Sequence, residues 1–157
     1  MTAPAPDELL PALHKAAADV AADAAKFSDS EVQAPSALPG WTRGHVLAHL
    51  TGISNAMARQ LEYAARGEAV ELYDGGMEGR NKAIDMAAGH DAATHRADLT
   101  AALDRARSRI DAGQDDPALA ANVDSLAARL GDSGEAGMED RKSALRETLT
   151  GIAGKLR

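Results

Sequence analysis

The chain has 157 residues, a formal net charge of −7 and no cysteine. Its length suits one domain with a core of useful size, and we expect residues 1–157 to form that single domain. Hydrophobic residues make up 45% of the chain but aromatic residues only 3%, which favours closely packed helices over strands. The lack of cysteine excludes disulfides, zinc-thiolate sites and a cysteine nucleophile, so any thiol chemistry needs a thiol that arrives as a cofactor.

The distribution of charged and apolar residues excludes several classes of partner. Lysines and arginines are scattered rather than arranged in a basic stripe, so we expect no nucleic-acid binding. The chain contains no run of about 18 apolar residues, so we expect no membrane span. The N-terminus carries Pro, Asp and Glu instead of the lysines and apolar core of a signal peptide. From these absences we expect a cytoplasmic protein, and its alanine-rich surface indicates a homodimer as one option.

The hydrophobic pattern of the first half of the chain predicts two long helices. The first covers about residues 8–27 and carries apolar residues at helical spacing. A polar connector over residues 28–41 follows, and the second helix covers about residues 43–66. We expect Thr42 to cap the second helix by accepting a backbone hydrogen bond from its first turn, and Gly67 to end it.

The second half of the chain predicts four more helices. A short helix is expected over about residues 77–88, and a long one, capped by Asp91, over about residues 92–112. A further short helix fits residues 117–130, and a last long helix fits residues 138–156. Four long amphipathic helices of this kind predict an all-α fold, a mostly antiparallel four-helix bundle with additional short helices.

Residues 39–49, Pro-Gly-Trp-Thr-Arg-Gly-His-Val-Leu-Ala-His, form the most informative stretch of the sequence. His45 and His49 are four residues apart on a predicted helix, so they project from one face of it, close to the only tryptophan, Trp41. Two imidazoles placed in this way can begin a metal site if more ligands converge from facing helices. The alternative, histidines of the core or the surface that bind no metal, stays open. We expect His95, in the first turn of a later helix, at the surface.

Arg80 and Glu147 are two further candidate site residues. Arg80, next to Asn81 near the start of the short helix, can bind an anionic substrate group through a forked pair of hydrogen bonds. The alternative is a surface arginine paired with Glu78 or Asp85. Glu147 lies beside the apolar stripe of the last predicted helix and can face the mouth of the bundle, although its charged neighbours indicate a solvated face.

Residues 38–50, Leu-Pro-Gly-Trp-Thr-Arg-Gly-His-Val-Leu-Ala-His-Leu, resemble the signature of the mycothiol-dependent maleylpyruvate isomerase N-terminal domain. That domain belongs to the DinB-like superfamily of four-helix metalloproteins. Further similar blocks follow in the same order: Ala-Arg-Gly-Glu at residues 65–68, then Tyr73, then Glu-x-Arg-Asn-x-x-Ile at residues 78–84. The resemblance covers residues 9–112, and it implies a DinB-like bundle.

The resemblance also implies chemistry. In the family the bundle holds one divalent metal, usually taken as zinc, which stabilises the thiolate of mycothiol, the low-molecular-weight thiol of actinobacteria. The family's first ligand falls on His49, and Arg-Glu at residues 146–147 resembles the family's Arg-Glu and places a second ligand on Glu147. The family's third ligand, a histidine, falls on Gly151, so the predicted metal site is incomplete unless His45 completes it.

Two functions are consistent with these residues. In the first, a metal at His49 and Glu147, completed by His45 or water, activates mycothiol for isomerisation or thiol transfer. The candidate residues for binding the substrate are Arg80, Asn81 and Trp41. In the second, the bundle has lost the metal and binds a small molecule or a partner without catalysis. A structural homodimer with no ligand is a third option.

Overall fold

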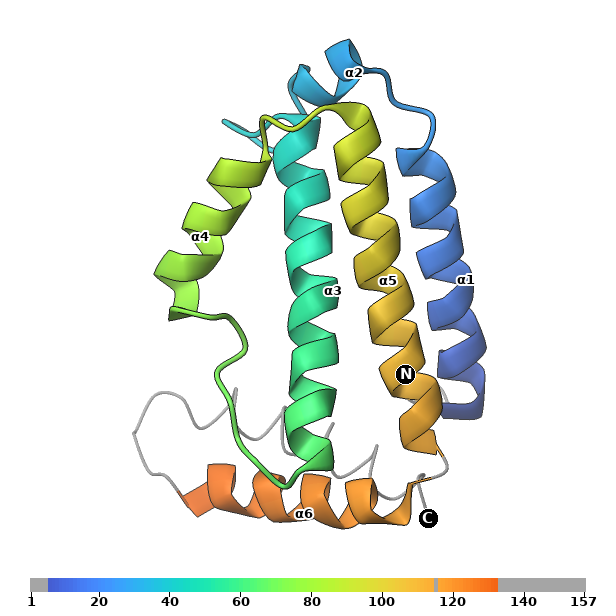
Figure 1. The fold of residues 1–157 in the computed structure, drawn as a ribbon, viewed down its shortest axis with the longest axis vertical. Coiled ribbons are helices and arrows are strands. Elements are labelled where there is room, and N and C mark those ends of the chain that lie inside the picture. Colours follow the sequence, from blue (N-terminus) through green and yellow to red (C-terminus); the bar gives the residue numbers. More distant parts are fainter. Residues whose placement is uncertain (1–5, 115, 133–157) are drawn as a thin grey trace. The chain divides into compact units, whose positions relative to one another are not determined.

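The computed structural model describes residues 6–114 and 116–132, and in this part of the chain it contains six helices. These are α1 (Pro6–Ala24), α2 (Asp29–Gln33), α3 (Arg43–Ala65), α4 (Gly76–Ala87), α5 (Ala92–Gln114) and α6 (Pro117–Asp132) (Figure 1). The prediction of an all-α helical bundle is confirmed. The predicted last helix, residues 138–156, lies outside the described residues. None of the helices in the described ranges is long and apolar enough to cross a membrane.

Local signals in the sequence explain where these helices begin and end. The carboxylate of Asp91 accepts a hydrogen bond from the backbone N–H of Thr94 at 2.7 Å, which caps α5 as predicted. Gly67, with φ of +71°, follows the end of α3. There the backbone N–H of Glu68 donates to the carbonyl of Tyr63 at 3.0 Å, the bond pattern that ends many helices at a glycine. The predicted bounds of the three long helices within the described residues therefore agree with the structure to within a few residues.

Helix α2 was not predicted, because its five residues lie inside the segment expected to be a polar connector. It begins with a capping box: Ser28 Oγ accepts from the backbone N–H of Glu31 at 3.4 Å, and Glu31 Oε2 accepts from the backbone N–H of Ser28 at 2.8 Å. Its apolar residue, Val32, is 1% exposed. One turn is too short for a helical hydrophobic pattern to be visible in the sequence.

The contacts within the chain define two compact units, residues 1–58 with 71–108 and residues 59–70 with 109–157. In the first unit, α1, α3 and α5 lie side by side and α4 lies beside α3, with α1 and α4 running opposite to α3 and α5 (Figure 1). Small and medium-sized apolar side chains from α1, α2, α3 and α5 form its core. The buried members of that core are Ala24, Val32, Leu47, Ala92 and Leu99.

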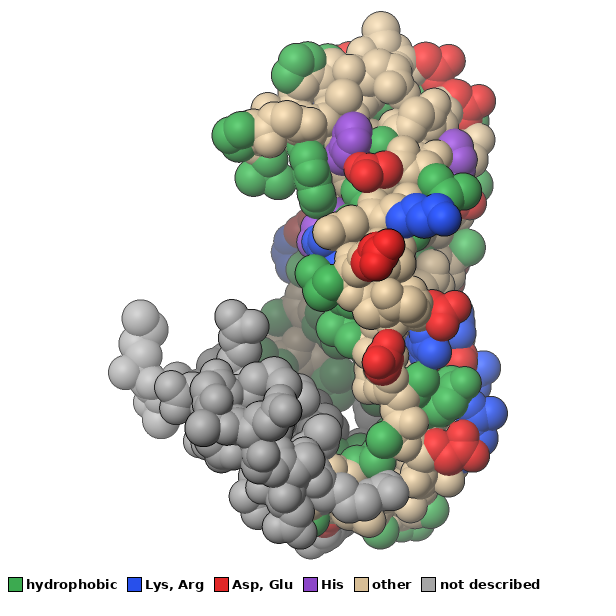
Figure 2. Space-filling view, turned by 90° about the vertical axis from the view of Figure 1, so that its left-hand side faces the viewer, with side chains coloured by type: hydrophobic (Ala, Val, Ile, Leu, Met, Phe, Trp, Pro, Cys, Tyr) green, Lys and Arg blue, Asp and Glu red, His purple; other side chains and the backbone are tan. Residues whose placement is uncertain are grey.

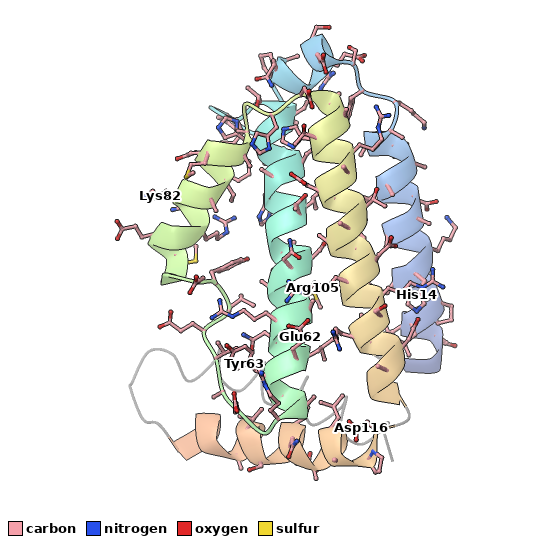
Figure 3. The ribbon with its side chains drawn as sticks, viewed as in Figure 1. His14, Glu62, Tyr63, Lys82, Arg105 and Asp116 are labelled. Carbon is pink, nitrogen blue, oxygen red and sulfur yellow. The ribbon has the colours of Figure 1, made fainter. Side chains whose placement is uncertain are left out.

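The second unit contains the end of α3, the end of α5 and the described part of α6. Its apolar cluster consists of Ala64, Leu119 and Val123, with Leu126 packed against them. The side chain of Asn122 donates to the carbonyl of Ala65 at 3.2 Å. Arg109 donates to Glu62, labelled in Figure 3, at 3.1 Å. The second unit thus combines a small apolar cluster with polar links between its helices.

The start of α3 lies very close to the end of α4. Gly44 is buried, and a Cβ atom at this position would overlap the backbone carbonyl oxygen of Ala88 and lie 3.2 Å from Nε2 of His95. Ala88 is the C-cap residue of α4, and His95 belongs to the first turns of α5. Glycine at position 44 therefore allows three helix ends to meet.

We predict that Gly44→Ala lowers the free energy of unfolding by about 1–3 kcal/mol, because the added methyl group forces the backbones of α3 and α4 apart. Gly52→Ala is the matched control on the same helix, since a Cβ there meets nothing within 4 Å. That variant should gain up to about 1 kcal/mol from helix propensity. Urea unfolding followed by circular dichroism measures both effects, and equal effects of the two substitutions would contradict the proposed close contact.

The prediction that His95 lies at the surface is wrong, since only 2% of it is exposed. It follows Ala92 by three residues and precedes Leu99 by four, so it belongs to the buried stripe of α5. Because histidine is polar, a search for apolar residues at helical spacing does not include it. Nε2 of His95 lies 3.4 Å from the carbonyl oxygen of Ala88. Burial lowers the pKa of His95, and the bond to Ala88 opposes that shift.

This lowered pKa predicts that acid destabilises the protein. The unfolded chain takes up a proton on His95 near the ordinary pKa of about 6.5, whereas the folded chain takes it up only at lower pH. The contribution of His95 to stability is therefore complete above that pH and falls as the pH drops toward the folded pKa. We expect His95→Gln, which keeps an N–H donor but cannot be protonated, to show a smaller loss between about pH 7.5 and 5 in urea unfolding. An unchanged pH dependence in this variant would contradict the assignment.

Candidate functional site

The two histidines that the sequence analysis singled out lie in the first turns of α3, and Trp41 lies just before the helix. The ring of Trp41 stacks on His45, with ring centroids 5.8 Å apart and an angle of 25° between the planes. Its distance to the ring of His49 is 6.0 Å, in an edge-to-face arrangement at 66°. Both imidazoles therefore share one face of α3 and one aromatic neighbour, as their spacing predicts.

His45 takes part in the cap of α3. Oγ1 of Thr42 accepts a hydrogen bond from the backbone N–H of His45 at 3.3 Å, which confirms Thr42 as the capping residue. In return, Nδ1 of His45 accepts from the backbone N–H of Thr42 at 3.2 Å and lies 2.8 Å from Oγ1. This is a capping box in which histidine stands where Glu or Gln is usual.

The capping bond determines which nitrogen of His45 is free for other contacts. A backbone N–H can only donate, so Nδ1 carries a lone pair and the proton of the neutral ring is on Nε2. Nε2 lies 3.8 Å from Oδ1 of Asp85, which projects from α4 and is largely exposed. On the face drawn in Figure 2, a histidine side chain lies against an acidic one, with hydrophobic side chains nearby.

Arg80 of α4 meets His49 of α3. Its Nη2 lies 3.1 Å from Nδ1 of His49, and its Nη1 donates to Oδ1 of Asn81 at 2.7 Å. Its guanidinium carbon is 5.7 Å from the centre of the Tyr73 ring. Arg80 is thus half-buried among His49, Asn81 and Tyr73, not paired with Glu78 or Asp85 as the alternative interpretation of the sequence had it.

The contact with Arg80 determines which ring nitrogen of His49 carries the proton. A guanidinium has no acceptor, so Nδ1 of His49 must accept, and the proton of the neutral ring is on Nε2. Burial is the main cause that lowers the pKa of His49, and the positive charge of Arg80 lowers it further. A neutral imidazole beside a charged guanidinium is therefore the state of this pair near pH 7.

The described residues do not fit a divalent metal at His49 while Arg80 occupies this position. Nδ1 is engaged by Arg80, and a metal at Nε2 would require the ring proton to move to Nδ1, against the guanidinium donor. A divalent ion about 5 Å from a guanidinium is also repelled by several kcal/mol at an effective dielectric constant of about 20. Among residues 6–114 and 116–132, no three His, Cys, Asp or Glu side chains lie close enough together to hold an ion. The predicted ligand Glu147 lies outside the described residues.

The pair of Arg80 and His49 is suited to bind an anion. A guanidinium has five N–H donors, and the bonds to His49 and Asn81 use two of them. A separate open hollow of about 670 Å³ lies along α4, and neither Arg80 nor His49 is among its lining residues. Its lining residues are Met77, Glu78, Asn81, Lys82, Asp85 and Met86. Lys82 lies on the exposed side of α4 (Figure 3).

The sequence analysis did not identify two features of this site. Tyr73, which lies under the guanidinium of Arg80, was noted only as part of a block that resembles the family. The exchange of hydrogen bonds between Thr42 and His45 was also missed, although Thr-x-x-His has the spacing of a capping box. That spacing is a signal that could have separated the role of His45 from that of His49.

We predict that His45 stabilises the start of α3 through its cap. His45→Ala should lower the free energy of unfolding by about 0.5–1 kcal/mol, whereas His45→Gln should keep most of it, because Gln is favoured at this position of a capping box. Thermal or urea unfolding of both variants provides the measurement. If Gln destabilises the protein as much as Ala does, the capping role is wrong.

Comparison with known proteins agrees with the resemblance seen in the sequence. The chain matches the mycothiol maleylpyruvate isomerase N-terminal domain over residues 13–146, a stretch that includes Trp41, His45, His49 and Arg80. No curated protein and no solved structure gives a match. Because the match covers most of the chain, the protein belongs to the family of the mycothiol maleylpyruvate isomerase N-terminal domain.

Proposed function

We propose that this protein binds a small carboxylate-bearing molecule at Arg80, in a mycothiol-associated process of the kind that the name of its family describes. That name joins a thiol, mycothiol, to maleylpyruvate, a molecule with two carboxylates. The observation that carries the proposal is the position of the Arg80 guanidinium, half-buried and held by His49, Asn81 and Tyr73.

The chemistry of these groups favours a carboxylate over other ligands. The two terminal nitrogens of an arginine match the two oxygens of a carboxylate and form strong, charge-assisted hydrogen bonds with it. His49, whose pKa is lowered, adds no second positive charge, while its ring and that of Trp41 provide aromatic surface for the rest of a small molecule. Asn81 contributes a further polar group beside the guanidinium.

The proposed site is compatible with an enzyme or with a binding protein, and conversion of the bound molecule distinguishes the two. In an isomerase or thiol transferase, the bound carboxylate positions the substrate for reaction with mycothiol. In a binding protein, the same site holds the carboxylate without conversion. An assay with mycothiol and maleylpyruvate separates the two forms, because only the enzyme consumes the substrate at a rate that depends on mycothiol.

We predict that maleate, a small dicarboxylate, binds the wild-type chain and that Arg80→Gln weakens binding by about tenfold to a hundredfold, as expected for the loss of charge-assisted hydrogen bonds. Lys82→Gln removes the same charge from the exposed side of α4 and should change the affinity less than about twofold. Isothermal titration calorimetry at fixed ionic strength gives the dissociation constants. Equal affinities of the wild type and Arg80→Gln, or no binding to the wild type, would refute the proposed site.

A further inference from the structure

We infer that Arg80 takes the place of a divalent metal at His49, so that the guanidinium is the cation that recognises the carboxylate of the ligand. The inference rests on the proposed function, since it concerns the same site and the same ligand. It goes beyond the proposed function by stating that binding needs no metal ion and that Arg80 itself keeps an ion away from His49.

The hydrogen bonding of His49 is the first support. The donor Nη2 of Arg80 lies 3.1 Å from Nδ1, which leaves Nε2 with the proton of the neutral ring. A metal ion needs a lone pair on a ring nitrogen. The lone pair on Nδ1 faces Arg80. A lone pair on Nε2 requires the other tautomer, in which the ring proton is on Nδ1 and points at the N–H groups of the guanidinium. Neither ring nitrogen of His49 can therefore bind a metal ion while Arg80 keeps its contact with Nδ1.

The way in which Arg80 is held is the second support. Its other terminal nitrogen donates to Asn81 at 2.7 Å, and the guanidinium lies over the ring of Tyr73. These contacts come from α4 and from the segment before it, while His49 comes from α3, so the guanidinium is fixed from two sides. A side chain held in this way keeps its positive charge beside His49.

The surrounding charges are consistent with one cation at this position. Asp85, an acidic side chain of α4, lies 3.8 Å from Nε2 of His45, and 72% of its side chain is exposed. The guanidinium is thus the charge that a ligand meets at His49 in the described part of the chain. An anion gains from this charge, and a metal ion is repelled by it.

The test compares metal content and maleate binding in the full chain. Wild type, Arg80→Gln and Lys82→Gln are each treated with a chelator, reloaded with zinc and desalted, and zinc is measured by elemental analysis. We expect the wild type to keep less than about 0.1 zinc per chain and to bind maleate with the same dissociation constant, within about twofold, in chelator or in zinc. Maleate binding by Arg80→Gln should be weaker by about tenfold or more under both conditions.

A second measurement reads the contact directly. Long-range proton–nitrogen NMR correlations report which nitrogen of His49 carries the proton. We expect protonation at Nε2 in the wild type and in Lys82→Gln, and a change of the Nδ1 signal in Arg80→Gln. This readout depends on the contact between Arg80 and His49, and a general loss of stability would not reproduce it.

The outcomes separate this inference from the proposed function. About one zinc per wild-type chain that His49→Ala removes, or maleate binding that requires zinc, overturns the inference. Maleate binding that requires zinc still supports the proposed ligand. A wild-type chain that binds no maleate under any condition refutes the proposed function and, with it, the role of Arg80 in recognising the ligand.

Discussion

The contact between the start of α3 and the end of α4 determines where the candidate site residues lie. Gly44 allows it, because any side chain at that position would collide with the carbonyl group of Ala88. A core rich in alanine gains only about 0.8 kcal/mol for each buried methyl group, so its helices must approach closely to pack well. The same approach brings His49, one turn further along α3, within hydrogen-bond distance of Arg80 on α4. Packing and site geometry thus have one cause.

The two histidines of α3 are both hydrogen-bond acceptors through Nδ1, but they serve different partners. His45 accepts from the backbone of Thr42 and belongs to the helix cap, while His49 accepts from Arg80 and belongs to the site. Two imidazoles one turn apart suggest a metal site when only their spacing is known. Their hydrogen-bond partners argue against an ion at Nδ1 of either ring, because a nitrogen that already accepts a hydrogen bond has no lone pair left for an ion.

Much of the fold could be predicted because its signals are local. The caps at Thr42 and Asp91 and the glycine at position 67 depend on neighbours within a few residues, and the structure has the helix ends there. The contact between Arg80 and His49 could not be predicted, since 31 residues separate them and only the packing of α4 on α3 brings them together. The burial of His95 was hidden for the same reason, because its place in the core depends on neighbouring helices.

A guanidinium and a metal ion would select different ligands at this position. A metal ion forms a bond to a single sulfur atom and stabilises the thiolate directly. A guanidinium presents parallel N–H groups that match two oxygens in a plane, and a single sulfur atom uses that fork poorly. If Arg80 is the cation, as we propose, the site favours the carboxylate of a substrate over the thiolate of mycothiol. Within a family named for both molecules, the bonds that hold Arg80 support our proposal that this chain recognises a carboxylate.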